Sequence, residues 1–209
     1  MRTSIRLGLT ALITAMLLAS ALSTASARNL SLSNQSFRVT WSRLEFEGGI
    51  LSFRCQLTLE GSFHSRTIPK VERLLIGSIT RITIKEESCE GGVRMSVAKA
   101  PPWHITYEGF TGRLPNIGTI RPLMQRFQFN IILLGATCRY GTATDNLTYS
   151  AILNAAGEVT NLVPLTGRDI AHLLNGSEIC PPELAFAGSA TDGRVTLLNS
   201  TTRIRVTLI

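Results

Sequence analysis

The sequence predicts an all-β fold, either an antiparallel β-sandwich or a barrel-like domain, with one short helix and two disulfides. Apolar and polar residues alternate along many short stretches, and Gly, Asn and Asp residues separate these stretches. Alternation with a period of two is typical of half-buried strands, and frequent turn residues are typical of antiparallel sandwiches and barrels. The four cysteines add a disulfide framework to this fold class.

The alternating stretches mark the expected strands. Every second residue of Leu51–Leu59 is apolar, which indicates a strand with one wet face. The preceding stretch changes phase between Trp41 and Leu44, which predicts a β-bulge, and Glu47–Gly49 supplies the turn between the two strands. The other expected strands are Val93–Val97, Trp103–Tyr107, Phe127–Leu133, Leu147–Leu153, Leu184–Phe186, Val195–Leu197 and Ile204–Leu208.

Two segments have a less regular pattern. We expect a turn at Pro69–Arg73, followed by a strand that includes Ile82 and Ile84. Thr166–Leu174 is typical of a short helix, because Thr166 can serve as its N-cap and Asn175-Gly176 can stop it.

The N-terminus predicts export. Two arginines precede a mostly apolar stretch at residues 7–22, and Ala25 and Ala27 frame a small-residue cleavage site. An uncleaved transmembrane anchor is the alternative, but the apolar stretch is short of the roughly 20 residues that a span needs. We expect residues 1–27 to be a signal peptide. Residues 28–209 then form a single mature β domain, secreted or at the cell surface, with no membrane span after cleavage.

Four cysteines in an exported chain predict two disulfides. Three pairings are possible, and we favour Cys55–Cys89 with Cys138–Cys180 because each bond then staples one half of the domain. Loops of this length contribute roughly 3–4 kcal/mol each in the chain-entropy model. Metal binding is the alternative, but the sequence has no C-x-x-C motif and no Cys–His pair at ligand spacing. We expect no metal and no cofactor.

The net charge is dispersed along the chain. The formal charge of the whole sequence is +7, and removal of the two signal-peptide arginines leaves about +5. Such a charge is typical of a solvated surface, and attraction to anionic cell-wall polymer or lipid head groups is the alternative. Arg203 and Arg205 lie on one face of the last expected strand, where they protect an edge strand or bind an anion. Nucleic acid is not an expected partner of an exported chain without interleaved aromatic and basic residues.

Several short segments carry a resemblance to known families. These segments are Phe37–Trp41, Cys55–Thr67, Pro102–His104 and Phe110–Pro115. The mature chain is similar over them to exported proteins of unknown function from soil actinobacteria. More distantly, the order Cys-x-x-Thr-Leu-x-Gly, a second Cys and then Pro-Trp resembles the secreted alkane-oxidation activators of the PraB type. The resemblance implies an extracellular accessory or surface role, and it brings no catalytic residues with it.

The sequence contains no catalytic signature. The three histidines form no H-E-x-x-H frame, and no G-x-S-x-G nucleophile elbow is present. A glycosidase needs two carboxylates that face a cleft. Glu45 with Glu47, or Glu60 with Glu108, are the pairs that spacing leaves open.

The segment Pro101–Tyr107 is the best candidate for a binding surface. Its alternation places Trp103 and Tyr107 on one face and His104 on the other. An exposed aromatic face would form a platform for sugar or a wall for an apolar ligand, whereas a buried one would be core.

Two functional hypotheses follow. The first is an exported, non-catalytic binding or cell-surface accessory module whose partner is a cell-wall polymer, a lipid or an apolar small molecule. The alternative is a secreted hydrolase that uses dispersed carboxylates.

Overall fold

The computed structural model describes residues 29–85, 89–113, 116–125, 127–141, 146–164, 170–187 and 193–209. Its elements are β-strands and one short 3₁₀ turn, η2, at Glu90–Gly92, which confirms the all-β prediction. No helix within these ranges is long and apolar enough to cross a membrane. The strands are β1 (Asn29–Leu32), β2 (Ser36–Gly48), β3 (Leu51–Phe63), β4 (Thr67–Pro69), β5 (Leu75–Lys85), β6 (Arg94–Val97), β7 (Trp103–Arg113), β8 (Asn116–Gln125), β9 (Gln128–Leu133), β10 (Ala136–Gly141), β11 (Asn146–Leu153), β12 (Val159–Pro164), β13 (Ile170–Asn175), β14 (Glu183–Ala187), β15 (Arg194–Leu197) and β16 (Val206–Leu208).

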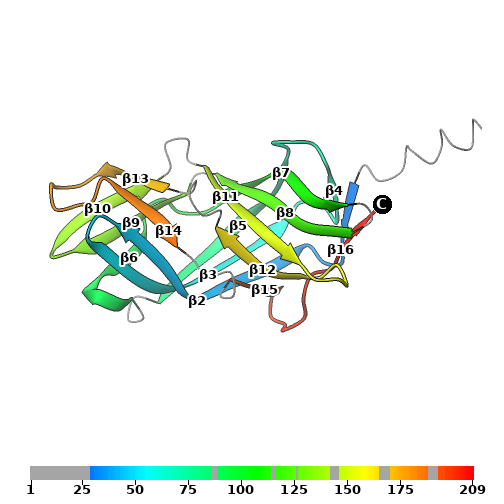
Figure 1. Ribbon diagram of the computed structural model, residues 1–209, viewed down its shortest axis with the longest axis horizontal. Coiled ribbons are helices and arrows are strands. Elements are labelled where there is room, and N and C mark those ends of the chain that lie inside the picture. The colour runs from blue at the N-terminus through cyan, green and yellow to red at the C-terminus, as the bar shows by residue number, and fades with distance from the viewer. Residues whose placement is uncertain are drawn as a thin grey trace, which may run out of the picture.

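Eight strands form a closed antiparallel barrel. The strands pair in the order β2, β3, β5, β7, β8, β11, β12 and β15, and β15 also pairs with β2 to complete the circle. A separate three-stranded sheet, β16-β1-β4, lies at one end of this barrel (Figure 1). We call it the cap sheet. Of the two architectures that the alternation allowed, the chain therefore adopts the barrel.

Five further strands extend the sheet beyond the barrel. β14 pairs with β2 at Glu45–Glu47, whereas β15 pairs with it at Phe37–Thr40, so these two strands lie end to end along β2. From β14 the sheet continues through β13, β10 and β9 to β6, and these strands form the opposite end of the molecule from the cap sheet (Figure 1). We call this part the extension.

The extension folds around an aromatic core. The ring centroid of Phe46 on β2 lies 5.7 Å from that of Phe129 on β9 and 5.1 Å from that of Phe186 on β14. Because β2 and β9 are four strands apart in the sheet order, this contact shows that the sheet curls back on itself. Alternation produces the core, since inward positions of β2, β9, β10 and β14 carry Phe46, Phe129, Tyr140 and Phe186.

The local predictions are confirmed at the bulge and wrong at the helix. The pairing of β2 with β3 shifts register between Trp41 and Leu44, as the change of phase predicted. Glu72 and Arg73 form a turn before β5, as expected. Ile170–Asn175, however, form strand β13, which pairs with both β10 and β14. Thr166 lies outside the described residues. Pairing on two sides outweighs a weak local helical pattern.

Both predicted disulfides are present. Cys55 on β3 is bonded to Cys89, which directly precedes η2 and β6. Since β3 and β6 are not hydrogen-bonded neighbours, this bond joins the two sides of the curled sheet. Cys138 on β10 is bonded to Cys180 in the connection between β13 and β14.

We expect the buried Tyr140 to make stability fall at high pH. Burial raises its pKa to about 12, and its hydroxyl donates a hydrogen bond to the carbonyl of Pro181 at 2.8 Å. An unfolded tyrosine ionises near pH 10, so between pH 10 and 12 the unfolded state binds fewer protons than the folded state, and stability is lost as pH rises. Urea unfolding at pH 8 and pH 11 should show this loss in the native chain. Tyr140→Phe should weaken the pH dependence and cost about 1 kcal/mol at pH 8; an unchanged pH dependence in the variant would contradict the assignment.

Candidate binding cavity

The interior of the barrel contains an apolar cavity of about 90 Å³. Every one of the eight barrel strands contributes at least one side chain to its wall. One such residue from each strand, in the order of the barrel, is Val39, Leu59, Ile79, Ile105, Met124, Tyr149, Leu162 and Val195. An eight-stranded barrel has an interior that either fills with side chains or holds one small ligand, and here the side chains leave a space.

The cap sheet closes one end of the cavity. Each of its three strands contributes one side chain to the wall: Leu32 from β1, Ile68 from β4 and Val206 from β16. Leu32 lies opposite Val206 in the register of the cap sheet, and all three residues are buried. Segments from the two ends of the described chain thus meet over the barrel and cover its interior.

Two tryptophans lie at the other end of the cavity. Trp41 is the next inward-facing residue after Val39 on β2, and Trp103 is the inward-facing residue before Ile105 on β7. The ring centroid of Trp41 lies 6.0 Å from that of Tyr149, whose side chain lines the cavity. Both indoles are 1% exposed, and the ring centroid of Trp103 lies 4.9 Å from that of Phe127, on the side of the extension.

The chemistry of the wall is that of a hydrocarbon solvent. Among the described lining residues, Tyr149 alone has a polar group on its side chain. A polar ligand group would give up its hydrogen bonds to water on entering and find few replacements, which costs several kcal/mol. An engineered apolar cavity of about 150 Å³ stays dry and accepts benzene or xenon. The cavity therefore suits a small ligand without hydrogen-bonding groups.

The sequence-predicted binding residues lie in the core or on the outside of the barrel. Trp103 and Tyr107 are 1% and 3% exposed, so they form no surface platform. The indole N–H of Trp103 donates to the carbonyl of Lys99 at 3.0 Å. Burial raises the pKa of Tyr107, and the charge of Arg121 opposes this shift. His104, on the opposite face of β7, is half-buried.

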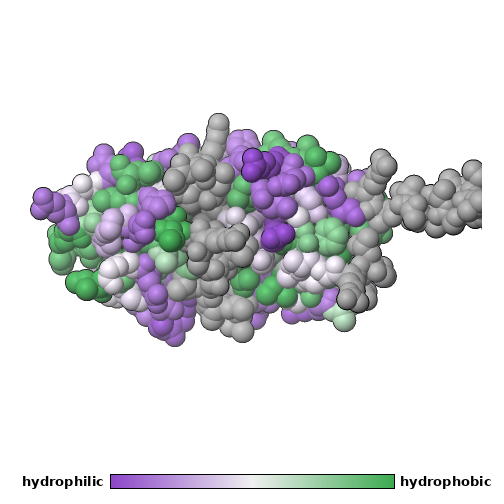
Figure 2. Space-filling view, turned by 45° about the horizontal axis from the view of Figure 1, so that its top comes forward, coloured by the Kyte–Doolittle hydropathy of each residue, from purple (hydrophilic) through white to green (hydrophobic). Residues whose placement is uncertain are grey.

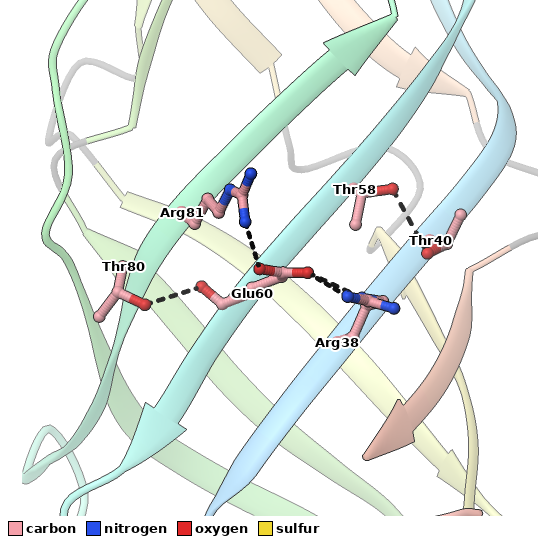
Figure 3. Close-up of polar contacts among 6 residues, drawn as sticks. All are labelled: Arg38, Thr40, Thr58, Glu60, Thr80 and Arg81. Carbon is pink, nitrogen blue, oxygen red and sulfur yellow. Dashed lines mark hydrogen bonds and ion pairs between the residues drawn. The ribbon is translucent and has the colours of Figure 1, made fainter. Parts of the chain in front are cut away.

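Glu60 belongs to a polar ladder on the outer face of the barrel (Figure 3). Arg38 on β2 donates from Nε and Nη2 to its Oε1 at 2.8 and 2.6 Å, and Nη1 of Arg81 on β5 lies 3.7 Å from its Oε2. Beside it, the hydroxyls of Thr40 and Thr58 are 3.4 Å apart. These cross-strand pairs join β2, β3 and β5 and support their register.

The other candidate carboxylates lie apart from one another or in ion pairs. Glu45 accepts a hydrogen bond from Arg54 at 2.9 Å. Glu60 and Glu108 lie on β3 and β7, which β5 separates. The hydrolase alternative gains no support from these positions.

Local ion pairs account for His172 and for the two arginines of the last expected strand. His172 Nδ1 lies 3.2 Å from Glu183 Oε1, across the pairing of β13 with β14. Arg203 and Arg205 lie 3.9 and 3.8 Å from the carboxylate of Glu158. The described residues contain no cluster of His, Cys, Asp and Glu that could hold a metal ion.

Comparison with protein-family models, curated proteins and solved structures found no significant match to this chain. The resemblance to exported actinobacterial proteins and to alkane-oxidation activators stays a prediction. The functional argument therefore depends on the barrel and its cavity.

Proposed function

We propose that the chain is an exported, non-catalytic binding module that holds one small apolar molecule inside its barrel. The apolar cavity carries this proposal, because every barrel strand and every strand of the cap sheet contributes an apolar side chain to it. Of the partners that the sequence suggested, the apolar small molecule is the one that the apolar lining of the cavity supports.

The disulfides support a place outside the cytoplasm. Both pairs of cysteines are bonded, and no free cysteine is present in the described residues. Such bonds persist in oxidising compartments. A module outside the cytoplasm that binds an apolar molecule can carry it through water or retain it at the cell surface.

The proposal predicts that small apolar compounds stabilise the protein. The probes are benzene and n-hexane, and phenol is the control because it adds a single hydroxyl to the benzene ring. A ligand at 100 times its Kd adds about 2.7 kcal/mol to the free energy of unfolding, which raises the Tm of a domain of this size by several degrees. Differential scanning calorimetry should show a Tm that rises with benzene or hexane concentration, and a smaller rise with phenol.

A second observable comes from the position of Trp41 at the end of the cavity. Because its ring contacts Tyr149, which lines the cavity, a bound molecule should change the tryptophan fluorescence at the same concentrations that raise Tm. If neither apolar compound raises Tm, or if phenol acts as strongly as benzene, the proposed function is wrong.

A further inference from the structure

The two most exposed large apolar side chains of the described residues lie at the tips of two hairpins, one formed by barrel strands β2 and β3 and one by β9 and β10 of the extension. Ile50 is 107% exposed and Leu134 is 85% exposed. Gly48 pairs with Leu51, which leaves Gly49–Ile50 as a two-residue turn between β2 and β3. Likewise the pairing of β9 with β10 leaves the two-residue turn Leu134–Gly135.

The turn chemistry does not account for these side chains. Leu134 has a φ of 49°, in the left-handed region where Asn, Asp and Gly are favoured and a leucine pays a steric cost. Because the Leu134 side chain is 85% exposed, packing contributes almost nothing to offset this steric cost. Ile50 follows Gly49, whose φ of 58° makes the turn, so the turn itself places no demand for a branched apolar residue at position 50. Both side chains therefore reduce or leave unchanged the stability of the fold.

A third segment brings further apolar side chains to the same end. Leu174, near the end of β13, and Ile179, in the connection between β13 and β14, are exposed, and the disulfide of Cys180 fixes this connection to β10. This connection lies beside the first hairpin, because a Cβ placed on Gly48 would meet the carbonyl of Glu183, where β14 begins. The second hairpin lies across the aromatic core, as the contact of Phe46 on β2 with Phe129 on β9 shows.

These four residues, Ile50, Leu134, Leu174 and Ile179, define what we call the apolar tips. Ile50 and Leu134 project from two hairpin turns, and Leu174 and Ile179 from the end of β13 and the connection that follows it. Figure 2 shows hydrophobic surface at this end of the molecule, interrupted by hydrophilic surface. The apolar area is therefore divided into separate protrusions.

From this arrangement we infer that the apolar tips insert into a lipid surface of zwitterionic head groups. A protein partner would need a separate pit for each protrusion and would have to cover the polar surface between them. Lipid tails accept each side chain independently, while the polar surface between the tips remains among the head groups.

The charge around the tips explains the choice of a zwitterionic surface. Charged side chains on the strands that lead to the first hairpin are paired, since Arg54 lies 2.9 Å from Glu45 and Arg43 lies 2.9 Å from Glu90. Such pairs of opposite charge neither attract nor repel an anionic surface strongly. Because the cap sheet is at the opposite end of the molecule, attachment through the tips leaves the covered end of the cavity facing away from the lipid (Figure 1).

The test is co-sedimentation of the protein with phosphatidylcholine vesicles. The double variant Ile50→Asn/Leu134→Asn keeps turn-compatible residues and removes both hairpin tips. Each large aliphatic side chain that enters hydrocarbon changes a partition coefficient by about tenfold or more, so the double variant should partition about 100-fold more weakly. Its Tm should not fall, because Asn favours the left-handed turn position.

The matched control is Val71→Asn/Ile209→Asn, which changes two exposed apolar residues that lie beside or follow the cap sheet. This variant should bind vesicles as the native chain does. The inference is overturned if the native chain does not bind vesicles, or if the two double variants lose binding equally. It is also overturned if sedimentation velocity without vesicles shows a dimer that the tip variant abolishes, because the tips would then be an interface between two copies.

Discussion

Replacing both Cys55 and Cys89 by alanine should lower the free energy of unfolding by about 4 kcal/mol. The two residues are 34 positions apart, and opening a loop of that length returns this much chain entropy to the unfolded state. The folded state is also affected, because the bond joins β3 to the start of β6 where no strand pairing connects them. Urea unfolding of the double variant, analysed as a two-state transition, measures the loss.

The control for this prediction is the removal of Cys138 and Cys180. Its loop has a separation of 42, so the chain-entropy contribution is similar. The difference lies in the folded state. Amide hydrogen exchange should become faster in β6 and β9 when Cys55–Cys89 is removed, whereas β10 stays paired on both sides when Cys138–Cys180 is removed. A loss below 1 kcal/mol for the first variant, or equal exchange in β6 for both, would contradict this account.

The strands and disulfides could be predicted from the sequence because their causes are local or chemical. Alternation fixed the inward face of β3, and a change of phase located the bulge after Trp41. Export and an even number of cysteines predicted the bonds. Closure of the barrel could not be predicted, because it depends on β15 pairing with both β12 and β2. Alternation defines the two faces of a strand but not its neighbours in the sheet.

The prediction of a helix at Thr166–Leu174 was wrong because a local pattern does not reveal which strands will lie beside a segment. The apolar residues of this segment fit a helical face as well as a short strand, and an N-cap signal with a following Asn-Gly favoured the helix. In the structure, Ala171 of β13 is fully buried between β10 and β14. Neighbours that are distant in sequence decided the conformation.

The cavity could not be predicted from residue types. Its wall consists mostly of Val, Ile and Leu residues at inward positions, and a pattern of inward positions does not say how completely the side chains fill the interior. The burial of Trp103 and Tyr107 could not be predicted either. Their alternation was compatible with a buried or an exposed face, and in the structure both side chains are buried. The sequence also did not predict the exposure of Leu134. This residue directly follows the apolar residues Ile131–Leu133 and looks like part of the strand, whereas in the structure it is the first residue of the turn.

Ala151→Leu should abolish ligand binding without unfolding the barrel, and it is the decisive test of the cavity. Ala151 lines the cavity from β11 and pairs with Ile120 on β8 and Leu162 on β12, which also line it. Three added carbon atoms at this position occupy the space that a ligand needs. We expect the Tm response to benzene to disappear, corresponding to at least a 100-fold weaker affinity.

The stability of this variant separates loss of binding from loss of fold. An empty cavity costs about 24 cal/mol per Å³, so a cavity of about 90 Å³ costs about 2 kcal/mol, and Ala151→Leu should recover part of it. The matched control is Ala185→Leu on β14, a half-buried position outside the barrel that pairs with Glu47. That variant should respond to benzene as the native chain does. If Ala151→Leu remains folded and still binds benzene with native affinity, the ligand does not occupy the barrel, and the binding role assigned to the cavity is wrong.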